Sequence, residues 1–251
     1  MPTPRYHARF AATPADVDAA QRLRHLAFIA ATGAAENAAR ATGRDADAFD
    51  GACRHVLVEE IATGRLVATF RLLPLAHGGE IGQSYAARTY DLGALAAWPG
   101  PMLEMGRFCL RPGCNDPDIL RLAWAQVARL VDEAGVGLLF GCSSFRGTDA
   151  GAYADAFAEL ARRHLAPRRW RPRAKAANVF RFARLLRKRE PDARRAWLTM
   201  PPLLRSYLAM GGWVSDHAVV DRDMDTLHVF TGLEVRRIPP ARARLMRALA
   251  V

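Results

Sequence analysis

Apolar and polar positions follow two different periods along this chain, and they predict both strands and helices. Short apolar runs bounded by turn residues predict strands, whereas apolar positions at helical spacing predict helices. The predicted strands are residues 55–61, 66–74, 102–110, 136–143, 213–220 and 226–235. The predicted helices are residues 13–32, 118–133, 152–164, 202–210 and 239–250. This order of elements is typical of an α/β fold with a mixed sheet.

The predicted strand 102–110, MLEMGRFCL, carries two charges, Glu104 and Arg107, within an apolar run. A buried charge is costly unless it is paired or used. Residues three apart on a regular strand face opposite sides, but a glycine within a strand often marks a bulge. We therefore predict a bulge near Gly106 that turns both charges toward one site. The alternative is a structural ion pair of Glu104 with Arg71 or Arg107.

Charges also occur in and before the other predicted strands. Arg71 interrupts a second apolar run, and the polar segment before the first strand ends in Asp45, Asp47 and Asp50. The aspartates could bind a cationic substrate, pair with Arg24 and Arg71, or form turns. A calcium loop is not expected, because the ligand spacing and the terminal glutamate are missing.

Two hydroxyls, those of Ser143 and Ser144, come at the C-terminal end of the predicted strand 136–143. We expect them at the mouth of a site, with a plain polar loop as the alternative. No GxSxG motif surrounds them, so a nucleophile is not indicated. The four cysteines are widely spaced and form no CxxC pair, so free thiols and no metal site are expected.

The net charge of +11 belongs to one segment of the chain. Residues 161–195 contain 14 Lys and Arg against 2 acids, whereas the remaining chain contains 22 against 23. Such a segment suits an acidic protein, an anionic membrane surface or a nucleic acid, or it is a solvated arginine-rich face. No helix-turn-helix, zinc finger or RNA-binding aromatic motif is visible, so no nucleic-acid partner is expected.

The chain has 251 residues, half of them hydrophobic, which is enough for a substantial core. No linker or repeat interrupts it, so we predict a single domain over residues 1–251 with a basic, mainly helical insertion at about 151–210. No apolar run approaches the roughly 20 residues that span a bilayer, and the N-terminus lacks a signal-peptide pattern. We therefore expect a cytoplasmic protein.

Taken in order, several of the charged residues resemble the signature of acyl-homoserine-lactone synthases, which belong with the GNAT-like N-acyltransferases. The residues that carry this resemblance are Arg24-x3-Phe28, Asp47-x2-Asp50, Arg71 and Glu104-x2-Arg107. The tryptophan that those synthases carry between the phenylalanine and the aspartate pair is absent here.

A second resemblance runs from about residue 20 to 235 and is to the ornithine N-acyltransferases of ornithine-lipid synthesis. The blocks that carry it are FDGACRHVLV, ATFRLLP, LEMGRFCLRP, LLFGCSSFRGTD, HLAP and PPLLRSYLAMGGWVSDHAVVDRDMDT. It implies a GNAT-like α/β fold in which helices flank a mixed central sheet, with helical C-terminal additions. It also implies transfer of a 3-hydroxyacyl group from acyl carrier protein to the α-amine of ornithine, giving a lyso-ornithine lipid. Acylation of glutamine or glycine, or acyl-homoserine-lactone synthesis from S-adenosylmethionine, stays open.

The resemblance also implies roles for individual residues. The acceptor amine must lose a proton to attack a thioester, so Glu104 would be the general base, and burial would raise its pKa. Backbone N–H groups at 106–108 would stabilise the oxyanion, and the helix start near Asp118 would face the phosphate of phosphopantetheine. The implied substrate-binding residues are Arg24, Arg71 and Arg107 toward a carboxylate, Asp47 and Asp50 toward a cationic end, and Phe28, Ser143 and Ser144.

The donor and the location of the enzyme follow from the same resemblance. The loop RPGCNDP has a single glycine, so a Gly-rich loop for coenzyme A is missing, which favours acyl carrier protein as donor. The acyl group would be carried on phosphopantetheine of that protein, and no other cofactor is expected. Because carrier protein and many inner-membrane lipids are anionic, residues 161–195 would bind one or both, with the enzyme peripheral on the inner membrane.

Overall fold

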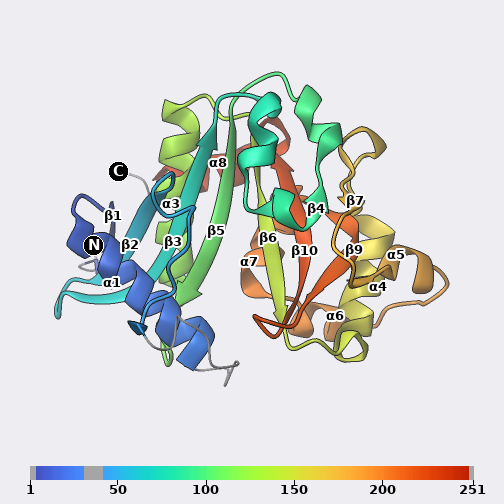
Figure 1. Ribbon diagram of the computed structural model, residues 1–251, viewed down its shortest axis with the longest axis horizontal. Helices are drawn as coiled ribbons and strands as arrows, with labels where there is room; N and C mark the ends of the chain where they lie inside the picture. Colours follow the sequence, from blue (N-terminus) through green and yellow to red (C-terminus); the bar gives the residue numbers. More distant parts are fainter. Residues whose placement is uncertain (1–3, 31–41, 249–251) are drawn as a thin grey trace. The chain divides into compact units, whose positions relative to one another are not determined.

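The structure is a computed structural model that describes residues 4–30 and 42–248 (Figure 1). The chain forms two compact units that are each assembled from separate stretches of sequence. The first unit comprises residues 1–74, 105–135 and 240–251, and the second comprises residues 75–104 and 136–239. The division falls within one strand, between Glu104 and Met105. The single domain expected from the sequence stays a prediction.

The first unit contains strands in the order β1-β2-β3-β5. They are β1 (Tyr6–Phe10), β2 (Arg54–Glu60), β3 (Arg65–Leu75) and β5 (Met102–Leu110), and the last residue of β3 and the first three of β5 belong to the second unit. β1 pairs antiparallel with β2, and β2 pairs antiparallel with β3. Residues 61–64 form the turn between β2 and β3, and Gly64 adopts a φ of 66° there.

Helices of the first unit are α1 (Pro14–His25), a π-helix (Leu26–Ala30), α3 (Pro117–Glu133) and α8 (Pro240–Ala248). α1 begins where Thr13 and Asp16 form a capping box, with proline at the first helical position. α3 packs against β1, β2 and α8, and Ile119 is fully buried in a cluster with Val58 and Val67. The predicted helix 13–32 therefore ends as an α-helix earlier than expected, and its last two positions lie outside the described residues.

One strand of the first unit was not predicted. β1 is short, and most of its residues, YHARF, are polar or only partly buried, so no apolar run marks it. Its pairing with β2, in register from Tyr6 opposite Glu60 to Phe10 opposite Val56, depends on residues about 50 positions away. Local sequence patterns do not carry that information.

The second unit contains strands in the order β6-β10-β9-β8, with antiparallel pairing throughout, and a separate pair of short strands, β4 and β7. The strands are β4 (Tyr90–Asp91), β6 (Leu138–Arg146), β7 (Arg173–Ala174), β8 (Val179–Phe180), β9 (Trp213–Asp221) and β10 (Thr226–Glu234). The helices are α4 (Ala154–Arg163), α5 (Phe182–Leu185), α6 (Ala193–Thr199) and α7 (Pro202–Ala209). Phe145, Phe157 and Phe182 form the centre of its apolar core.

Three 3₁₀ helices, Gly78–Gln83, Ala86–Arg88 and Gly93–Ala97, lie between β3 and β5. The first packs tightly on the third, because a Cβ at Gly78 would lie 2.3 Å from the carbonyl oxygen of Leu95. A side chain larger than that of glycine would not fit at this position. Within residues 4–30 and 42–248, every helix is too short or too polar to cross a bilayer.

Candidate functional site

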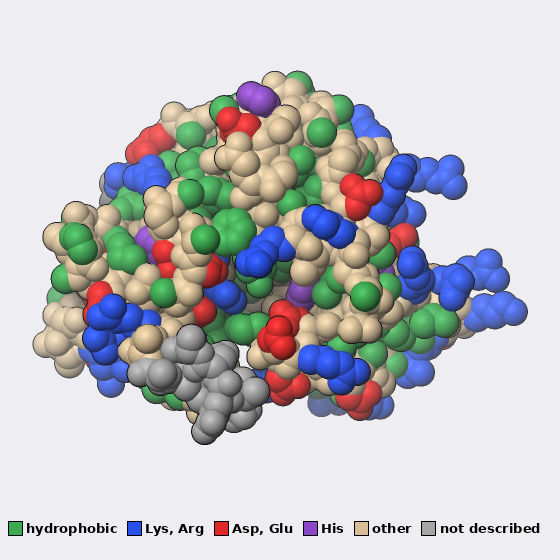
Figure 2. All heavy atoms as spheres, in the orientation of Figure 1, with side chains coloured by type: hydrophobic (Ala, Val, Ile, Leu, Met, Phe, Trp, Pro, Cys, Tyr) green, Lys and Arg blue, Asp and Glu red, His purple; other side chains and the backbone are tan. Residues whose placement is uncertain are grey.

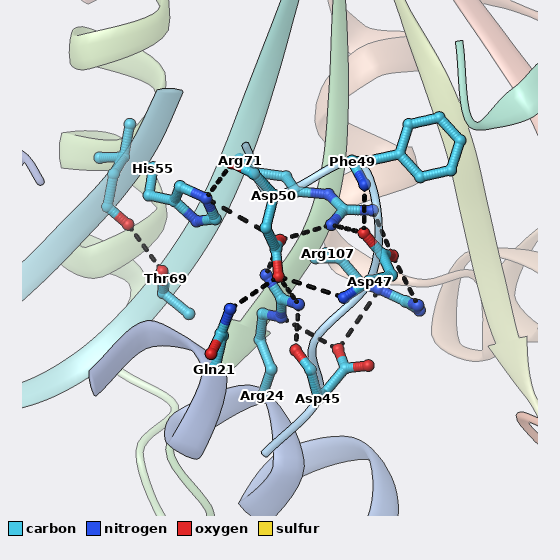
Figure 3. Close-up of polar contacts among 11 residues, drawn as sticks. Gln21, Arg24, Asp45, Asp47, Phe49, Asp50, His55, Thr69, Arg71 and Arg107 are labelled. Carbon is cyan, nitrogen blue, oxygen red and sulfur yellow. Dashed lines mark hydrogen bonds and ion pairs between the residues drawn. The ribbon is translucent and has the colours of Figure 1, made fainter. Parts of the chain in front are cut away.

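Three arginines and three aspartates of the first unit form a closed ring in which positive and negative charges alternate (Figure 3). The order around the ring is Arg24, Asp50, Arg71, Asp47, Arg107, Asp45 and back to Arg24. The arginines come from α1, β3 and β5, and all three aspartates come from the segment before β2. The ring thus ties that segment to three regular elements.

The inner part of the ring is fully buried. The Arg24 side chain is 1% exposed and contacts Asp50 through Nη1–Oδ1 at 2.7 Å and Asp45 through Nε–Oδ2 at 3.0 Å. It also donates to the carbonyl oxygen of Asp45. Gln21 donates to Asp50 Oδ2 at 2.9 Å, and His55 Nε2 lies 3.1 Å from the carbonyl oxygen of Asp50. These contacts satisfy the buried charges.

Arg71 connects the inner and outer parts of the ring. Its Nη1 lies 2.6 Å from both Asp47 Oδ1 and Asp50 Oδ1, and its Nη2 lies 2.8 Å from Asp47 Oδ2. The guanidinium also lies over the ring of Phe49, with 5.6 Å to the ring centroid. A two-pronged pair of this kind fixes direction as well as distance.

The outer edge of the ring is formed by Arg107, which makes longer contacts. Its Nε lies 3.3 Å from Asp45 Oδ2, and its Nη2 lies 3.4 Å from Asp47 Oδ2. The side chains of Arg107 and Asp47 are 14% and 18% exposed, whereas that of Arg71 is 4% exposed. The solvent-facing edge therefore has the longest ion-pair contacts of the ring.

The ring holds its carboxylates in the ionised form. Burial raises the pKa of Asp50, but hydrogen bonds and charge from Arg24 and Arg71 outweigh it, so the pKa lies well below the ordinary value. Burial likewise raises the pKa of Asp47, and Arg71 outweighs it to give a lowered pKa. Burial lowers the pKa of His55, so this imidazole is neutral near pH 7.

The structure thus brings five of the predicted substrate-binding residues together: Arg24, Asp47, Asp50, Arg71 and Arg107. Their charges are balanced among themselves and with Asp45, so the alternative in which the acids pair with arginines is confirmed. Phe28 lies in the π-helix after α1, one turn beyond Arg24, and is half-buried. Sequence reasoning placed Asp45 in the acidic segment but did not select it as a site residue.

Glu104 belongs to the second unit and is 4% exposed. Its Oε2 accepts a hydrogen bond from the backbone N–H of Tyr85 and its Oε1 accepts one from Ala86, each at 2.8 Å. The carboxylate therefore caps the 3₁₀ helix Ala86–Arg88. N–H donors favour a carboxylate over its protonated form, which opposes the effect expected from burial alone.

Tyr207, on α7, is a functional candidate that sequence reasoning missed. It is buried, and its pKa is raised by burial and by the negative charge of Glu104. A neutral phenol within electrostatic range of Glu104 can donate a hydrogen bond. No sequence signal points to it, because a tyrosine on an amphipathic helix reads as core.

The backbone of β5 departs from regular strand geometry, as predicted, but at a different residue. Arg107 has a φ of 54°, in the left-handed region that non-glycine residues seldom adopt. Gly106 has no positive φ, and a Cβ there would meet only Arg71 Nε at an ordinary 3.9 Å. The residue of β5 with the unusual backbone is therefore Arg107, which also belongs to the ring, and not the glycine.

The predicted position of Ser143 and Ser144 at the end of a strand is wrong. β6 continues to Arg146, so both serines lie within the strand. Ser143 is buried and accepts a hydrogen bond from the hydroxyl of Thr231 at 2.9 Å, whereas Ser144 is exposed and lies opposite His228. Pairing with β10 extends the strand beyond its apolar run, and it gives the Ser143 hydroxyl a partner inside the sheet.

The N-terminus of α3 is already occupied by a side chain. Asp116 accepts the N–H of Asp118 at 3.0 Å and also contacts Arg5 and Tyr6. A carboxylate at this position competes with a phosphate for the same donors. The phosphate position near Asp118 stays a prediction, and a phosphate there would have to displace the Asp116 carboxylate.

The described residues offer little support for thiol or metal chemistry. Burial raises the pKa of Cys109 to about 12, so this thiol is a poor nucleophile at neutral pH. All four cysteines are free thiols, as predicted. Across residues 4–30 and 42–248, no group of three His, Cys, Asp or Glu side chains is placed to hold a metal ion.

Comparison with known families supports this reading of the fold. Residues 23–125 match the acetyltransferase (GNAT) domain, and this stretch contains the whole ring and Glu104. The predicted GNAT-like α/β fold, in which helices flank a mixed central sheet, is confirmed.

Similar proteins cover most of the chain. The L-ornithine N(alpha)-acyltransferase of Rhodobacter capsulatus is 36% identical over 230 residues, which is 89% of this chain and 88% of the relative. The enzyme of the same name from Brucella abortus is 31% identical over 238 residues, 92% of this chain and 84% of the relative. Among solved structures, FeeM, an N-acyl amino acid synthase from uncultured soil microbes, is 15% identical with a TM-score of 0.49 and covers 99% of this chain and 98% of its own.

Proposed function

Because this chain belongs to the L-ornithine N(alpha)-acyltransferase family, we propose that it transfers a 3-hydroxyacyl group from acyl carrier protein to the α-amine of ornithine. The product would be a lyso-ornithine lipid, the first intermediate of ornithine-lipid synthesis. The observation that carries this proposal is identity of 36% over 89% of the chain, a stretch long enough to include both the ring and Glu104. The chain is an acyl-transferring enzyme.

The outer edge of the ring supplies a binding mode for the acceptor. Ornithine carries an α-carboxylate and a side-chain ammonium, which is the same pair of charges that Arg107 and Asp47 hold against each other. Their mutual contact of 3.4 Å is the longest in the ring and the most exposed. We propose that the acceptor's carboxylate binds Arg107 and its side-chain ammonium binds Asp47. Arg71 keeps Asp47 ionised while this exchange takes place.

Proton transfer from the amine needs a base, and Glu104 remains the proposed one. Each of its oxygens accepts one backbone N–H, and these two bonds hold the carboxylate in one orientation. Tyr207, neutral and electrostatically coupled to Glu104, would hold the base or the developing oxyanion through its hydroxyl.

The proposed donor is acyl carrier protein. The single glycine in RPGCNDP and the carboxylate cap of Asp116 on α3 leave little of a pyrophosphate-binding loop. The basic segment 161–195 would instead offer an acidic carrier protein a complementary charge, and its 14 Lys and Arg leave room for an anionic membrane as a second partner.

Incubation of the purified chain with 3-hydroxyacyl carrier protein and ornithine, followed by mass spectrometry, tests this proposal. We expect N-acylornithine, with slower turnover of the corresponding acyl-coenzyme A. Parallel reactions contain glutamine, glycine or S-adenosylmethionine as acceptor. Lactone release from S-adenosylmethionine would assign homoserine-lactone synthesis instead. Absence of an N-acyl product with every acceptor would exclude the proposal.

A further inference from the structure

A group of large hydrophobic side chains lies exposed on two short helices of the second unit that are close in the sequence and pack on the same helix, α4. Leu185, at the end of α5, is 58% exposed, and Trp197 and Leu198, on α6, are 55% and 69% exposed. They are half of the six large hydrophobic residues that are exposed in the described part of the chain. Single exposed apolar residues are ordinary, but three in one short segment indicate a contact surface.

The same segment carries exposed cations without ion-pair partners in the described structure. These residues are Arg181, Arg184, Arg187, Lys188 and Arg194. The neighbouring Arg189 and Arg195 instead contact the buried Asp155, at 2.8 and 3.6 Å. The segment therefore separates into cations that hold the fold together and cations that face solvent.

Packing against the core explains why these side chains point outward. Phe182 of α5 and Ala196 of α6 are buried, and both helices pack on α4. Trp197 and Leu198 follow Ala196 directly, so they lie about 100° and 200° around the helix from that buried position. On the side where Figure 1 places α5 and α6, Figure 2 shows Lys and Arg side chains projecting beside hydrophobic ones. Arg205 stacks on the ring of Trp197, with 4.9 Å to the centroid, and holds that ring in place.

We infer that this α5–α6 patch, residues 181–198, docks the enzyme on an anionic lipid bilayer. The two components of the patch match the two layers of a membrane interface: cations for the phosphate headgroups, and tryptophan and leucine for the boundary below them. Attraction to an acidic protein would need the cations but not two adjacent side chains that are more than half exposed. The inference does not depend on which amino acid is acylated.

Vesicle pelleting with the full chain tests the inference. We expect vesicles that contain phosphatidylglycerol to bind at least about tenfold more tightly than pure phosphatidylcholine vesicles, with binding weakened by salt. Two patch variants should each lose about tenfold or more: Arg184→Glu/Arg187→Glu/Lys188→Glu, and Trp197→Ser/Leu198→Ser. All five residues are exposed, and thermal unfolding checks that each variant remains folded.

A matched control is available on α8. Arg242, Arg244 and Leu245 are also exposed, and Arg242→Glu/Arg244→Glu/Leu245→Ser makes the same kind of change away from the patch. This variant should bind vesicles like the unmodified chain. Equal loss in the control, or unchanged binding in both patch variants, would overturn the inference. Normal vesicle binding combined with a raised KM for acyl carrier protein in the charge variant would assign the patch to the carrier protein.

Discussion

Arg71 binds both carboxylate oxygens of Asp47, with Nη1 2.6 Å from Oδ1 and Nη2 2.8 Å from Oδ2. The same carboxylate lies 3.4 Å from Arg107 on its other side. Asp47 therefore takes part in a short, two-pronged ion pair with the buried Arg71 and in a longer ion pair with the more exposed Arg107. This asymmetry separates the buried side of the ring from the side at which we propose that the acceptor binds.

The structural side of the ring should dominate stability. Arg71→Ala leaves Asp47 and Asp50 without their shortest contacts, and we expect a loss of roughly 3 to 5 kcal/mol in the free energy of unfolding. Urea unfolding at pH 7 measures it. Arg65→Ala is the control, because Arg65 lies on the same strand with a side chain that is 51% exposed and should cost less than about 1 kcal/mol. Similar losses in the two variants would contradict a structural ring.

The outer edge of the ring should determine how tightly the acceptor binds. Arg107→Ala is expected to raise the KM for ornithine by roughly 10- to 100-fold, the value of one charge-assisted hydrogen bond. Norvaline lacks the terminal amine but keeps the carboxylate, so its KM should rise as well. Asp47→Asn should weaken the binding of ornithine much more than the binding of norvaline. If Asp47→Asn affects both acceptors equally, the terminal ammonium does not bind there.

The base role of Glu104 can be separated from its capping role. Glu104→Gln is expected to lower kcat by about 100-fold or more, because the amide cannot accept a proton. Ser84→Ala is the matched control: Ser84 Oγ accepts the N–H of Ala87, so the variant loosens the same turn and leaves the carboxylate intact. Equal kcat losses in the two variants would show that Glu104 acts only by holding the turn. Tyr207→Phe should lower kcat less than Glu104→Gln does.

Stability should fall as the pH is lowered from neutral, because of a buried histidine. Burial lowers the pKa of His228 from 6.5 to about 4. Between pH 6.5 and about pH 4, His228 is protonated in the unfolded chain but stays neutral in the folded chain. Unfolding is therefore favoured across this window. The contribution reaches roughly 3 kcal/mol at the acid end. The free energy of unfolding of His228→Gln should depend less on pH between these values than that of the unmodified chain, and an equal dependence would contradict this prediction.

The aspartates of the ring should affect the stability of the fold at a lower pH than His228 does. The pKa values of Asp47 and Asp50 are lowered from 3.8 in the folded chain. Their ion pairs therefore stabilise the fold above pH 4, and that stability is lost as the pH falls toward the lowered values. Asp50→Asn should be less stable at pH 7 and should show a shallower loss of stability below about pH 4. If the loss of stability below about pH 4 is the same in Asp50→Asn as in the unmodified chain, other carboxylates cause it.

Much of this molecule could be read from local patterns. The apolar runs located every strand of four residues or more except β1, and the helical periods located α3, α4, α7 and α8. Period and burial are properties of neighbouring residues, so a sequence window contains them. The ordered charges also marked most members of the ring and the departure of β5 from regular geometry.

The choice of partners was not in those patterns. Arg107 meets Asp47 across 60 positions of sequence, and Ser143 meets Thr231 across 88. The sequence by itself determined which residues are charged, where all but one of the longer strands lie, and the family to which the chain belongs. Tertiary structure alone decided that six charges balance in a ring, that Glu104 binds two backbone N–H groups and that Ser143 lies inside a sheet. A buried polar group must find its partner in three dimensions, and spacing along the chain does not determine which partner it finds.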